Sequence, residues 1–220
     1  MIITRTPFRV SLCGGGSDIR SFYEKHGGCV LSTTINKYMY ITSHPSFDKK
    51  TTVLKYSKTE IVHNIDEIEH NIFRECLKKE GIEGLEITSI ADVPQGTGLG
   101  SSSSFTVGLI ENLKCYKREY ISKAEVAAAA CDMENNIVHT TNGKQDQYAA
   151  AFGGLNFYKF NKDGSVDVEP VLMNHEAFKQ LEKNLIMLYV GGEHKASSIL
   201  EEQSKNIVTA KDKEEGQKKI

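Results

Sequence analysis

The spacing of apolar and polar residues along the chain predicts an alternation of strands and helices. Ile2–Val10 has the pattern of a strand, and Pro7 within it predicts an edge or irregular position because proline has no N–H to donate. Cys29–Ile35 and Tyr38–Ser43 are predicted to form a pair of strands with their turn at Asn36-Lys37. Two further strands are predicted at Leu85–Ala91 and Leu155–Phe160.

Apolar residues that recur every three or four positions predict helices in the other segments. Ser122 and Glu125 have the spacing of a capping box at the start of one of them. The predicted helices are Ile19–His26, a segment from Ile65 to Leu77 that Gly81 ends, Phe105 to about Tyr116, and Lys123 to about Val138. Gln145–Phe152 is predicted to form a helical turn. Long helices mixed with several non-alternating strands indicate an α+β fold, with a mixed sheet and helices on one face.

The last part of the chain continues this pattern. Leu185–Val190 is a continuous apolar run, which is typical of a buried strand, and Gly191-Gly192 ends it. Ala196–Asn206 has helical spacing. Lys211–Ile220 is mostly charged, as expected for a solvated helix face or a frayed end.

The charge balance narrows the choice of partner. Lys and Arg number 27 and Asp and Glu 29, a net charge of −2, which argues against nucleic acid or an anionic membrane as the main partner. The apolar runs are too short to span a bilayer, and the N-terminus reads as a strand rather than a signal peptide, so a cytoplasmic location is expected. The five cysteines and seven histidines lack the spacing of a disulfide framework or a zinc site, so metal binding through thiolate or imidazole is not expected.

Candidate chemistry begins with the segment from Val93 to Ser104, between a predicted strand and a predicted helix. Gly96, Gly98 and Gly100 allow the backbone to approach a ligand closely, and the N–H groups at the start of the helix favour an anion. The four serines that follow add hydroxyl donors and a potential Mg²⁺ ligand. No lysine follows the last glycine, so this is not a Walker P-loop. The alternative is a flexible connection.

Four charged residues are further candidates. Glu134 lies on the inward stripe of its predicted helix, where a carboxylate must be paired, protonated or bound to a metal, although an ordinary salt-bridged glutamate is an equal alternative. Asp146 is either a general base or a helix cap. Arg9, inside an apolar strand, favours an anionic or carboxylate partner. Asp18 closes a glycine loop and reads by default as a turn residue.

Three motifs resemble those of the GHMP small-molecule kinases. They are Thr6-Pro-Phe-Arg-Val-Ser-Leu-Cys-Gly-Gly-Gly-Ser-Asp18, Pro94-Gln-Gly-Thr-Gly-Leu-Gly-Ser-Ser-Ser103 and Gly143-Lys-Gln-Asp-Gln147. Within the family, the strings Gly27-Gly-Cys-Val-Leu-Ser-Thr-Thr-Ile-Asn-Lys-Tyr38 and Gly143–Gly154 are most similar to the sugar-1-kinase branch that acts on a heptose 7-phosphate. Galactokinase-like members have Gly-Glu-His where this chain has Gly14-Gly-Gly16, which disfavours galactose.

The resemblance implies a role for each matched position. Asp146 would accept or orient the proton of the sugar hydroxyl, and Arg9 would offset charge beside it. Ser102 and Glu134 would hold Mg²⁺ between the phosphates of ATP. The nucleotide would contact Pro94, Gly96, Thr97, Gly98, Leu99, Gly100, Ser101, Ser102 and Ser103, and the sugar would contact Gly14, Gly15, Gly16, Ser17 and Asp18.

The family's fold has two domains, and the resemblance covers roughly Ile2 to Asn206. It implies an N-terminal ATP-binding and catalytic domain over residues 1–180, and a C-terminal ferredoxin-like domain that is only begun over residues 181–220. The family's third, glycine-rich motif is not found, and the apolar surface of a half-domain would favour a homodimer. The expected function is an ATP-dependent kinase for the anomeric hydroxyl, with heptose 7-phosphate as acceptor and the 1,7-bisphosphate as product. The alternatives are another sugar 1-kinase, fucokinase- or galactokinase-like, or an idle binding module.

Overall fold

The computed structural model describes residues 1–140 and 143–188. Its centre is one mixed sheet with the strand order β4-β3-β5-β2-β6-β7, in which β1 also pairs with β2. The β3–β5 pair is parallel and the other pairs are antiparallel. The strands are β1 (Ile2–Cys13), β2 (Gly28–Pro45), β3 (Thr52–Lys55), β4 (Thr59–Val62), β5 (Leu85–Ala91), β6 (Leu155–Phe160) and β7 (Val166–Pro170).

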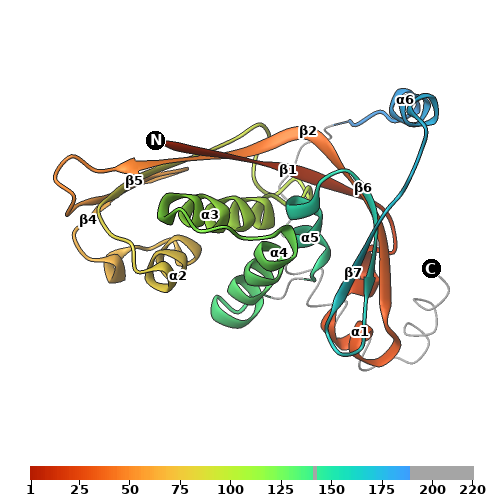
Figure 1. Ribbon diagram of the computed structural model, residues 1–220, viewed down its shortest axis with the longest axis horizontal. Helices are drawn as coiled ribbons and strands as arrows, with labels where there is room; N and C mark the ends of the chain where they lie inside the picture. The colour runs from red at the N-terminus through yellow and green to blue at the C-terminus, as the bar shows by residue number, and fades with distance from the viewer. Residues whose placement is uncertain (141–142, 189–220) are drawn as a thin grey trace.

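The helices α2, α3 and α4 lie on the same face of the sheet (Figure 1). The helices are α1 (Arg20–His26), α2 (Asn71–Glu80), α3 (Ser101–Lys117), α4 (Lys123–Asp132), α5 (Gln145–Phe152) and α6 (His175–Asn184), with 3₁₀ turns η1 (Gly15–Asp18) and η2 (Ile65–Glu67) and a π-helical turn η3 (Met133–Ile137). The α+β class, with a mixed sheet and helices on one face, is therefore confirmed.

Helix α3 is the central element of the core, and polar groups fix it against the sheet. Asn112 is fully buried and donates to the carbonyl of Ile41 at 3.1 Å, while Thr4 Oγ1 donates to the carbonyl of Gly108 at 2.9 Å. A Cβ on Gly108 would lie 2.6 Å from Thr6 Oγ1, so only glycine allows β1 and α3 to approach this closely. These contacts determine where the first turn of α3 lies relative to β1.

Strand β1 pairs only with β2 among the described strands, and its register shifts between Pro7 and Arg9. The proline is therefore at an edge and beside an irregularity, as predicted, where its missing N–H costs no ladder bond. The hydroxyl of Ser104 at the start of α3 donates to the Pro7 carbonyl at 2.9 Å. This bond joins the irregular part of β1 to the helix start.

Two sequence predictions were wrong in detail. Cys29–Ile35 and Tyr38–Ser43 are not a hairpin but parts of the single strand β2, because Asn36-Lys37 lacks the glycine that tight turns favour and β1 accompanies β2 on both sides of that dipeptide. The helix predicted from Ile65 is a 3₁₀ turn followed by α2, which begins at Asn71 with the His70 side chain as its N-cap. The strands β3, β4 and β7 and the helix α6 were not predicted from the sequence.

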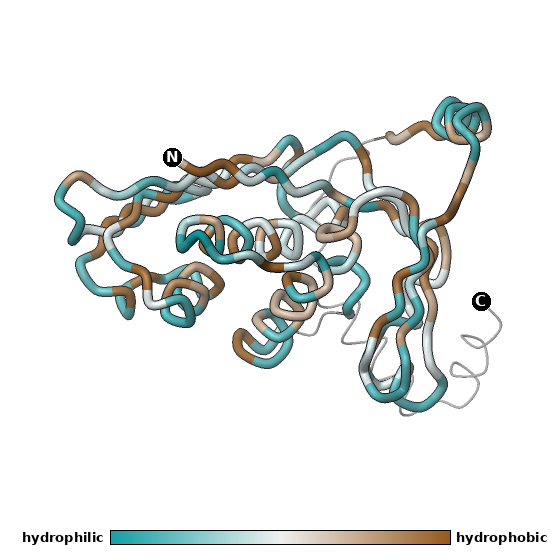
Figure 2. Tube along the Cα trace, in the orientation of Figure 1, coloured by the Kyte–Doolittle hydropathy of each residue, from teal (hydrophilic) through white to brown (hydrophobic). Residues whose placement is uncertain are grey.

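The apolar run predicted as a buried strand does not form one over its described part. Leu185–Leu188 has no regular structure, and Ile186 is 83% exposed, because no described strand lies beside it and its side chains have no core to enter. The segments on either side of α6 are apolar (Figure 2), with Leu172 93% exposed. Residues 189 and 190, the predicted helix Ala196–Asn206 and the charged end lie outside the described residues.

Within residues 1–140 and 143–188, no helix combines the length and the apolar character needed to cross a membrane.

Candidate active site

The glycine-rich segment forms a loop that ends at the first turn of α3. Gly96, Gly98 and Gly100 have φ of 80°, 74° and 74°, the left-handed region that glycine adopts without strain. Gly100 is the N-cap of α3, and no side chain caps the helix there. The first amides of α3 therefore face the open end of the helix, where backbone N–H groups and the helix dipole favour an anion.

Arg9 on strand β1 binds this loop through both its backbone and its side chain. The backbone N–H of Arg9 donates to the carbonyl of Leu99 at 3.1 Å, and its Nη1 donates to the carbonyl of Gly98 at 2.7 Å. The same guanidinium bonds Asp146 on α5 with two parallel contacts, Nε to Oδ1 at 2.7 Å and Nη2 to Oδ2 at 2.8 Å. Bidentate pairing of this kind fixes both position and orientation of the carboxylate.

The paired Asp146 remains accessible, because a quarter of its side chain is exposed. A Cβ placed on Gly100 would lie 3.2 Å from Asp146 Oδ2 and 3.3 Å from Arg9 Cγ. The carboxylate thus lies directly against the loop at the start of α3. Sequence reasoning assigned Arg9 a carboxylate or anionic partner, and the structure shows that Asp146 is that carboxylate.

Glu134 is fully buried, as its place on the inward stripe predicted. It lies in the π-helical turn that follows α4, a local widening that is frequent at functional sites. Its Oε2 accepts from Ser103 Oγ at 3.0 Å and from Gln147 Nε2 at 2.8 Å. The hydroxyl that contacts Glu134 is therefore that of Ser103, whereas Ser102 is exposed at the first turn of α3.

The loop Gly14–Asp18 lies beside the start of α5. Gly14 has φ of 84°, and a Cβ there would lie 2.1 Å from the carbonyl oxygen of Cys29. Ser17 Oγ closes the loop by donating to the carbonyl of Gly14 at 2.8 Å and accepting from the N–H of Cys29 at 2.9 Å. The loop is therefore tied to β2 and has a fixed shape.

Gln145 connects that loop to α5. Its Nε2 donates to the carbonyl of Gly15 at 3.1 Å, its Oε1 accepts from Ser11 Oγ, and its backbone N–H donates to Asp18 Oδ2 at 3.1 Å. A Cβ on Gly143 would lie 1.7 Å from the same Asp18 oxygen, so only glycine fits there. Gln145 and Asp146, adjacent in sequence, thus reach two different loops of one site.

Asp18 is not the solvated turn residue of the default interpretation. Its side chain is buried, with 1% exposure. Burial, together with the nearby charge of Asp146, raises the pKa of Asp18 from 3.8 to about 7, although the N–H of Gln145 and the charge of Arg9 act in the opposite direction.

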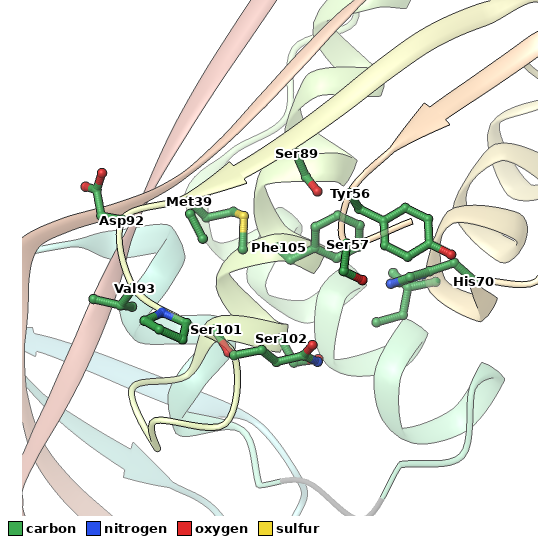
Figure 3. A pocket seen from close by; sticks show the side chains of 14 residues that line it. Met39, Tyr56, Ser57, His70, Ser89, Asp92, Val93, Ser101, Ser102 and Phe105 are labelled. Atoms are coloured by element: carbon green, nitrogen blue, oxygen red, sulfur yellow. The ribbon is translucent and has the colours of Figure 1, made fainter. Parts of the chain in front are cut away.

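A cavity of about 450 Å³ opens beside the first turn of α3. Figure 3 shows Ser101 and Ser102 near one end and the rings of Tyr56, His70 and Phe105 toward the other. Met39 and Val93 contribute apolar wall. Its size and its mixture of apolar wall with a few polar groups suit a small ligand with a flat aromatic part.

The structure thus brings Arg9, Asp146, Gly100 and Asp18 into one region. Glu134 is connected to this region by its hydrogen bonds to Ser103 on α3 and to Gln147 on α5. Three contributors were not predicted from the sequence. Their side chains are neutral and gave no charge or spacing signal, although two of them flank Asp146: they are Ser11, Gln145 and Gln147. Ser103 was predicted as a contact of the nucleotide, but its hydrogen bond to Glu134 was not.

A family model for the GHMP kinases N terminal domain matches residues 68–154. Over these residues the chain is similar to the N-terminal domain of the GHMP kinases. Two of the three motifs that resemble this family, the glycine-rich loop and Gly143–Gln147, lie inside the matched residues. The elements from α2 to α5 therefore lie within the matched residues, as do the loop, Glu134 and Asp146.

Three known proteins are similar to a larger part of this chain. The D-glycero-alpha-D-manno-heptose 7-phosphate kinase of Campylobacter jejuni is 30% identical over 212 residues, which are 91% of this chain and 62% of that protein. A galactokinase of Roseiflexus sp. is 29% identical over 164 residues, 69% of this chain and 40% of that protein. The crystal structure of a D-glycero-D-manno-heptose 1-phosphate kinase from Bacteriodes thetaiotaomicron has a TM-score of 0.77 and 27% identity over 83% of this chain and 63% of that one.

The chain thus spans less than two thirds of the length of each of these three relatives. The shared region includes the sheet and the helices that hold the candidate site. The structural similarity also confirms the GHMP kinase fold for this part of the chain.

Proposed function

We propose that this chain forms the ATP-binding and catalytic part of a sugar kinase that phosphorylates an anomeric hydroxyl. The observation that carries the proposal is the place of Asp146. Its carboxylate is fixed by Arg9 and lies beside Gly100 of the glycine-rich loop. Asp146 also adjoins Gln145, which bonds the loop that ends at Asp18. One accessible carboxylate therefore lies between a loop suited to phosphates and a loop suited to a polyhydroxyl ligand.

ATP would bind along the glycine-rich loop. The residues from Gly96 to Ser103, with Pro94, offer backbone N–H groups and hydroxyls to its phosphates. The neighbouring cavity of about 450 Å³ has the size and the apolar wall to take the nucleoside. The open N-terminus of α3 would stabilise negative charge on the phosphates.

Phosphoryl transfer at this site needs positioning more than covalent chemistry. The acceptor oxygen attacks the γ-phosphorus, the bond from that phosphorus to the β–γ bridging oxygen breaks, and ADP leaves. Asp146 accepts the proton of the attacking hydroxyl, and Arg9 orients Asp146 and offsets charge on the transferring group. An anomeric hydroxyl is more acidic than an ordinary alcohol, so a modest base is sufficient.

Glu134 and Ser102 are the proposed Mg²⁺ ligands. A carboxylate and a hydroxyl are among the oxygen ligands that this ion prefers. Ser103 and Gln147 both donate to Oε2 of the buried Glu134 carboxylate and hold it beside the start of α3. When bound, Mg²⁺ would neutralise charge on the β- and γ-phosphates.

The proposed acceptor is D-glycero-D-manno-heptose 7-phosphate, with the 1,7-bisphosphate as product, in the cytoplasm. Its support is the similarity to proteins named as heptose kinases and the loop Gly14–Asp18 that would hold sugar hydroxyls. The similarity to galactokinases favours a second candidate, another sugar 1-kinase. The third candidate is a binding module without turnover.

The division into a domain over residues 1–180 and a second one from 181 remains part of the proposal. The apolar side chains exposed on both sides of α6 support self-association of this chain into a homodimer. Measuring the molar mass in solution tests this point independently of activity.

The experiment for the activity is an ADP-release assay with Mg·ATP. The acceptors are heptose 7-phosphate, fucose, galactose, mannose and buffer alone. Turnover with the heptose phosphate alone supports the proposed acceptor, and turnover with another sugar supports the second candidate. Binding of Mg·ATP without turnover on any acceptor supports the third.

A further inference from the structure

His70 is a polar side chain in the cavity beside α3, and the reaction as described above gives it no role. It lies between β4 and α2, where its side chain is the N-cap of α2, and it lines the cavity. Figure 3 shows the His70 side chain pointing toward Ser57, at the end of the cavity away from Ser101 and Ser102. A ligand that fills this cavity therefore comes within reach of His70.

The hydrogen bond to one ring nitrogen fixes the tautomer of His70. Its Nδ1 accepts from the backbone N–H of Phe73 at 3.4 Å, so this nitrogen carries no proton. Burial lowers the pKa of His70 below its ordinary value of 6.5, although its own carbonyl and the charge of Glu60 act in the opposite direction. The ring is therefore neutral at pH 7, with its single proton on Nε2.

The Nε2–H group of His70 is a donor that is both open and held in place. Within residues 1–140 and 143–188 no group accepts from Nε2. None of the buried side-chain atoms that lack a partner in this part of the chain belongs to His70, so Nε2 is open to the cavity. The rings of Tyr56, Phe73 and Phe105 have centres 5.0, 5.1 and 5.2 Å from that of His70, and they fix the direction of the donor before a ligand binds.

The position of His70 relative to the start of α3 decides which part of a nucleotide meets this donor. With the phosphates at the first turn of α3, Phe105 is one helical turn further along. Figure 3 shows His70 on the side of Phe105 away from Ser101, so the ribose and the base fit between the helix start and His70. The edge of a purine most remote from the ribose then reaches Nε2. That edge is read by hydrogen bonds, and its N1 is an acceptor in adenine and a donor in guanine.

We propose that His70 selects the base of the nucleotide by donating its Nε2–H to N1 of adenine. This rests on the proposed function, which has the nucleoside in this cavity, and it names the side chain that distinguishes ATP from GTP. Guanine would bring an N–H group against the N–H of His70, and two donors that face each other are both left without a partner. The apolar wall formed by Met39 and Val93 contacts either purine.

Two ATP analogues that each lack one ring nitrogen test this hydrogen bond. 1-Deaza-ATP has a C–H group in place of N1 and cannot accept from His70, whereas 7-deaza-ATP keeps N1 and is the matched control. For the wild type, the Kd of 1-deaza-ATP should be about tenfold higher than that of ATP, the usual loss for one hydrogen bond. The Kd of GTP should be about a hundredfold higher, and that of 7-deaza-ATP should be within about threefold of the ATP value.

Variants of His70 must preserve the start of α2. His70→Asn keeps an N-cap side chain but is too short to reach the base, so it should bind ATP about tenfold more weakly and 1-deaza-ATP no more weakly than ATP. His70→Gln is longer, and its amide can turn to donate or to accept. It should bind ATP within about threefold of the wild type and GTP at least about tenfold better. His63→Asn, at an exposed histidine after β4, is the control and should match the wild type on every nucleotide.

The experiment is calorimetric titration of the whole chain with each nucleotide, with Mg²⁺ present and no sugar added, so that no acceptor is phosphorylated. Thermal unfolding of each variant shows whether α2 and the core are intact. Equal Kd values of ATP and 1-deaza-ATP for the wild type overturn the proposal. A tenfold preference for ATP over 1-deaza-ATP that persists in a folded His70→Asn also overturns it, because N1 would then accept from another group.

Binding and turnover separate this inference from the kinase proposal. If the effect of N1 depends on His70 but no sugar causes release of ADP, the proposed function fails and the role of His70 stands. If a sugar causes equally fast turnover of ATP and GTP, the chain is a kinase and the role of His70 is wrong. If none of the nucleotides binds, both are wrong.

Discussion

Arg9 and Asp146, 137 residues apart in sequence, form a two-point contact with bonds of 2.7 and 2.8 Å. The guanidinium belongs to an edge strand and the carboxylate to the first turn of α5. Because a third nitrogen of Arg9 bonds the carbonyl of Gly98, the pair fixes the distance between the carboxylate and the glycine-rich loop. That distance determines where an attacking hydroxyl meets a bound phosphate.

Replacement of the carboxylate tests its role as base. Asp146→Asn keeps the shape and removes the charge, so kcat should fall by about 10²- to 10⁴-fold, the usual contribution of a positioned acid or base. Nucleotide affinity should change less than about threefold, because the backbone of the loop is unaffected. ADP release and calorimetric ATP binding measure the two quantities, and a variant with wild-type turnover would remove Asp146 from this role.

Gly100→Ala tests the close contact between loop and carboxylate. The new Cβ would meet Asp146 Oδ2 at 3.2 Å, in a residue with φ of 74°, so kcat should fall by about tenfold to a hundredfold through misplacement of the base. The backbone strain alone should cost about 1–2 kcal/mol.

A matched control separates strain from the contact. Gly81 ends α2 with φ of 64°, and a Cβ there meets nothing within 4 Å. Gly81→Ala should lose a similar free energy of unfolding and keep its turnover. Equal loss of activity in the two variants would mean that destabilisation, and not the contact with Asp146, explains the effect.

The local pattern of the chain predicted the elements that pack by their own amphipathic faces. The bounds of β5, β6 and α5 agree with their sequence predictions, and Glu134 is buried as its helical stripe indicated. In β2 the pattern was misread, because the continuity of that strand depends on pairing with β1, which a local window does not contain.

The assembly of the site was less predictable, because its contacts join distant segments. The pairing of Arg9 with Asp146 and the burial of Asp18 under Gly143 depend on how β1, η1 and α5 meet. Gln145 and Gln147 went unnoticed because a neutral amide has no conspicuous chemistry until its neighbours are known. The resemblance to a kinase family indicated the charged residues, and the structure added the amides that orient them.

The two serines at the start of α3 should have separable effects. Ser102→Ala removes the exposed hydroxyl proposed as a Mg²⁺ ligand, so the Mg²⁺ concentration for half-maximal rate should rise at least about tenfold, with little change in Tm. Ser103→Ala removes a bond to a buried carboxylate and should also lower the stability, by about 1–3 kcal/mol. Thermal unfolding and Mn²⁺ binding followed by electron paramagnetic resonance distinguish the two. An unchanged metal affinity in Ser102→Ala would exclude that hydroxyl as a ligand.

The buried Asp18 carboxyl should also make folding stability depend on pH. Its pKa is about 7 in the folded chain and 3.8 ordinarily, so between these values the folded state binds more protons than the unfolded state. Stability therefore falls as pH rises from about 4 to about 7, and the cost is complete above that range. The full cost is on the order of 4 kcal/mol.

Asp18→Asn removes this titration and should leave the folded chain more stable than the wild type at pH 8. Near pH 5, where the folded carboxyl is still neutral and only about a third of the cost has accrued, the difference should be smaller by about 2–3 kcal/mol. Urea unfolding at pH 5 and pH 8 measures both free energies, with Asp167→Asn as the exposed control that should follow the wild type. A difference between Asp18→Asn and the wild type that is the same at both pH values would mean that Asp18 is ionised when buried.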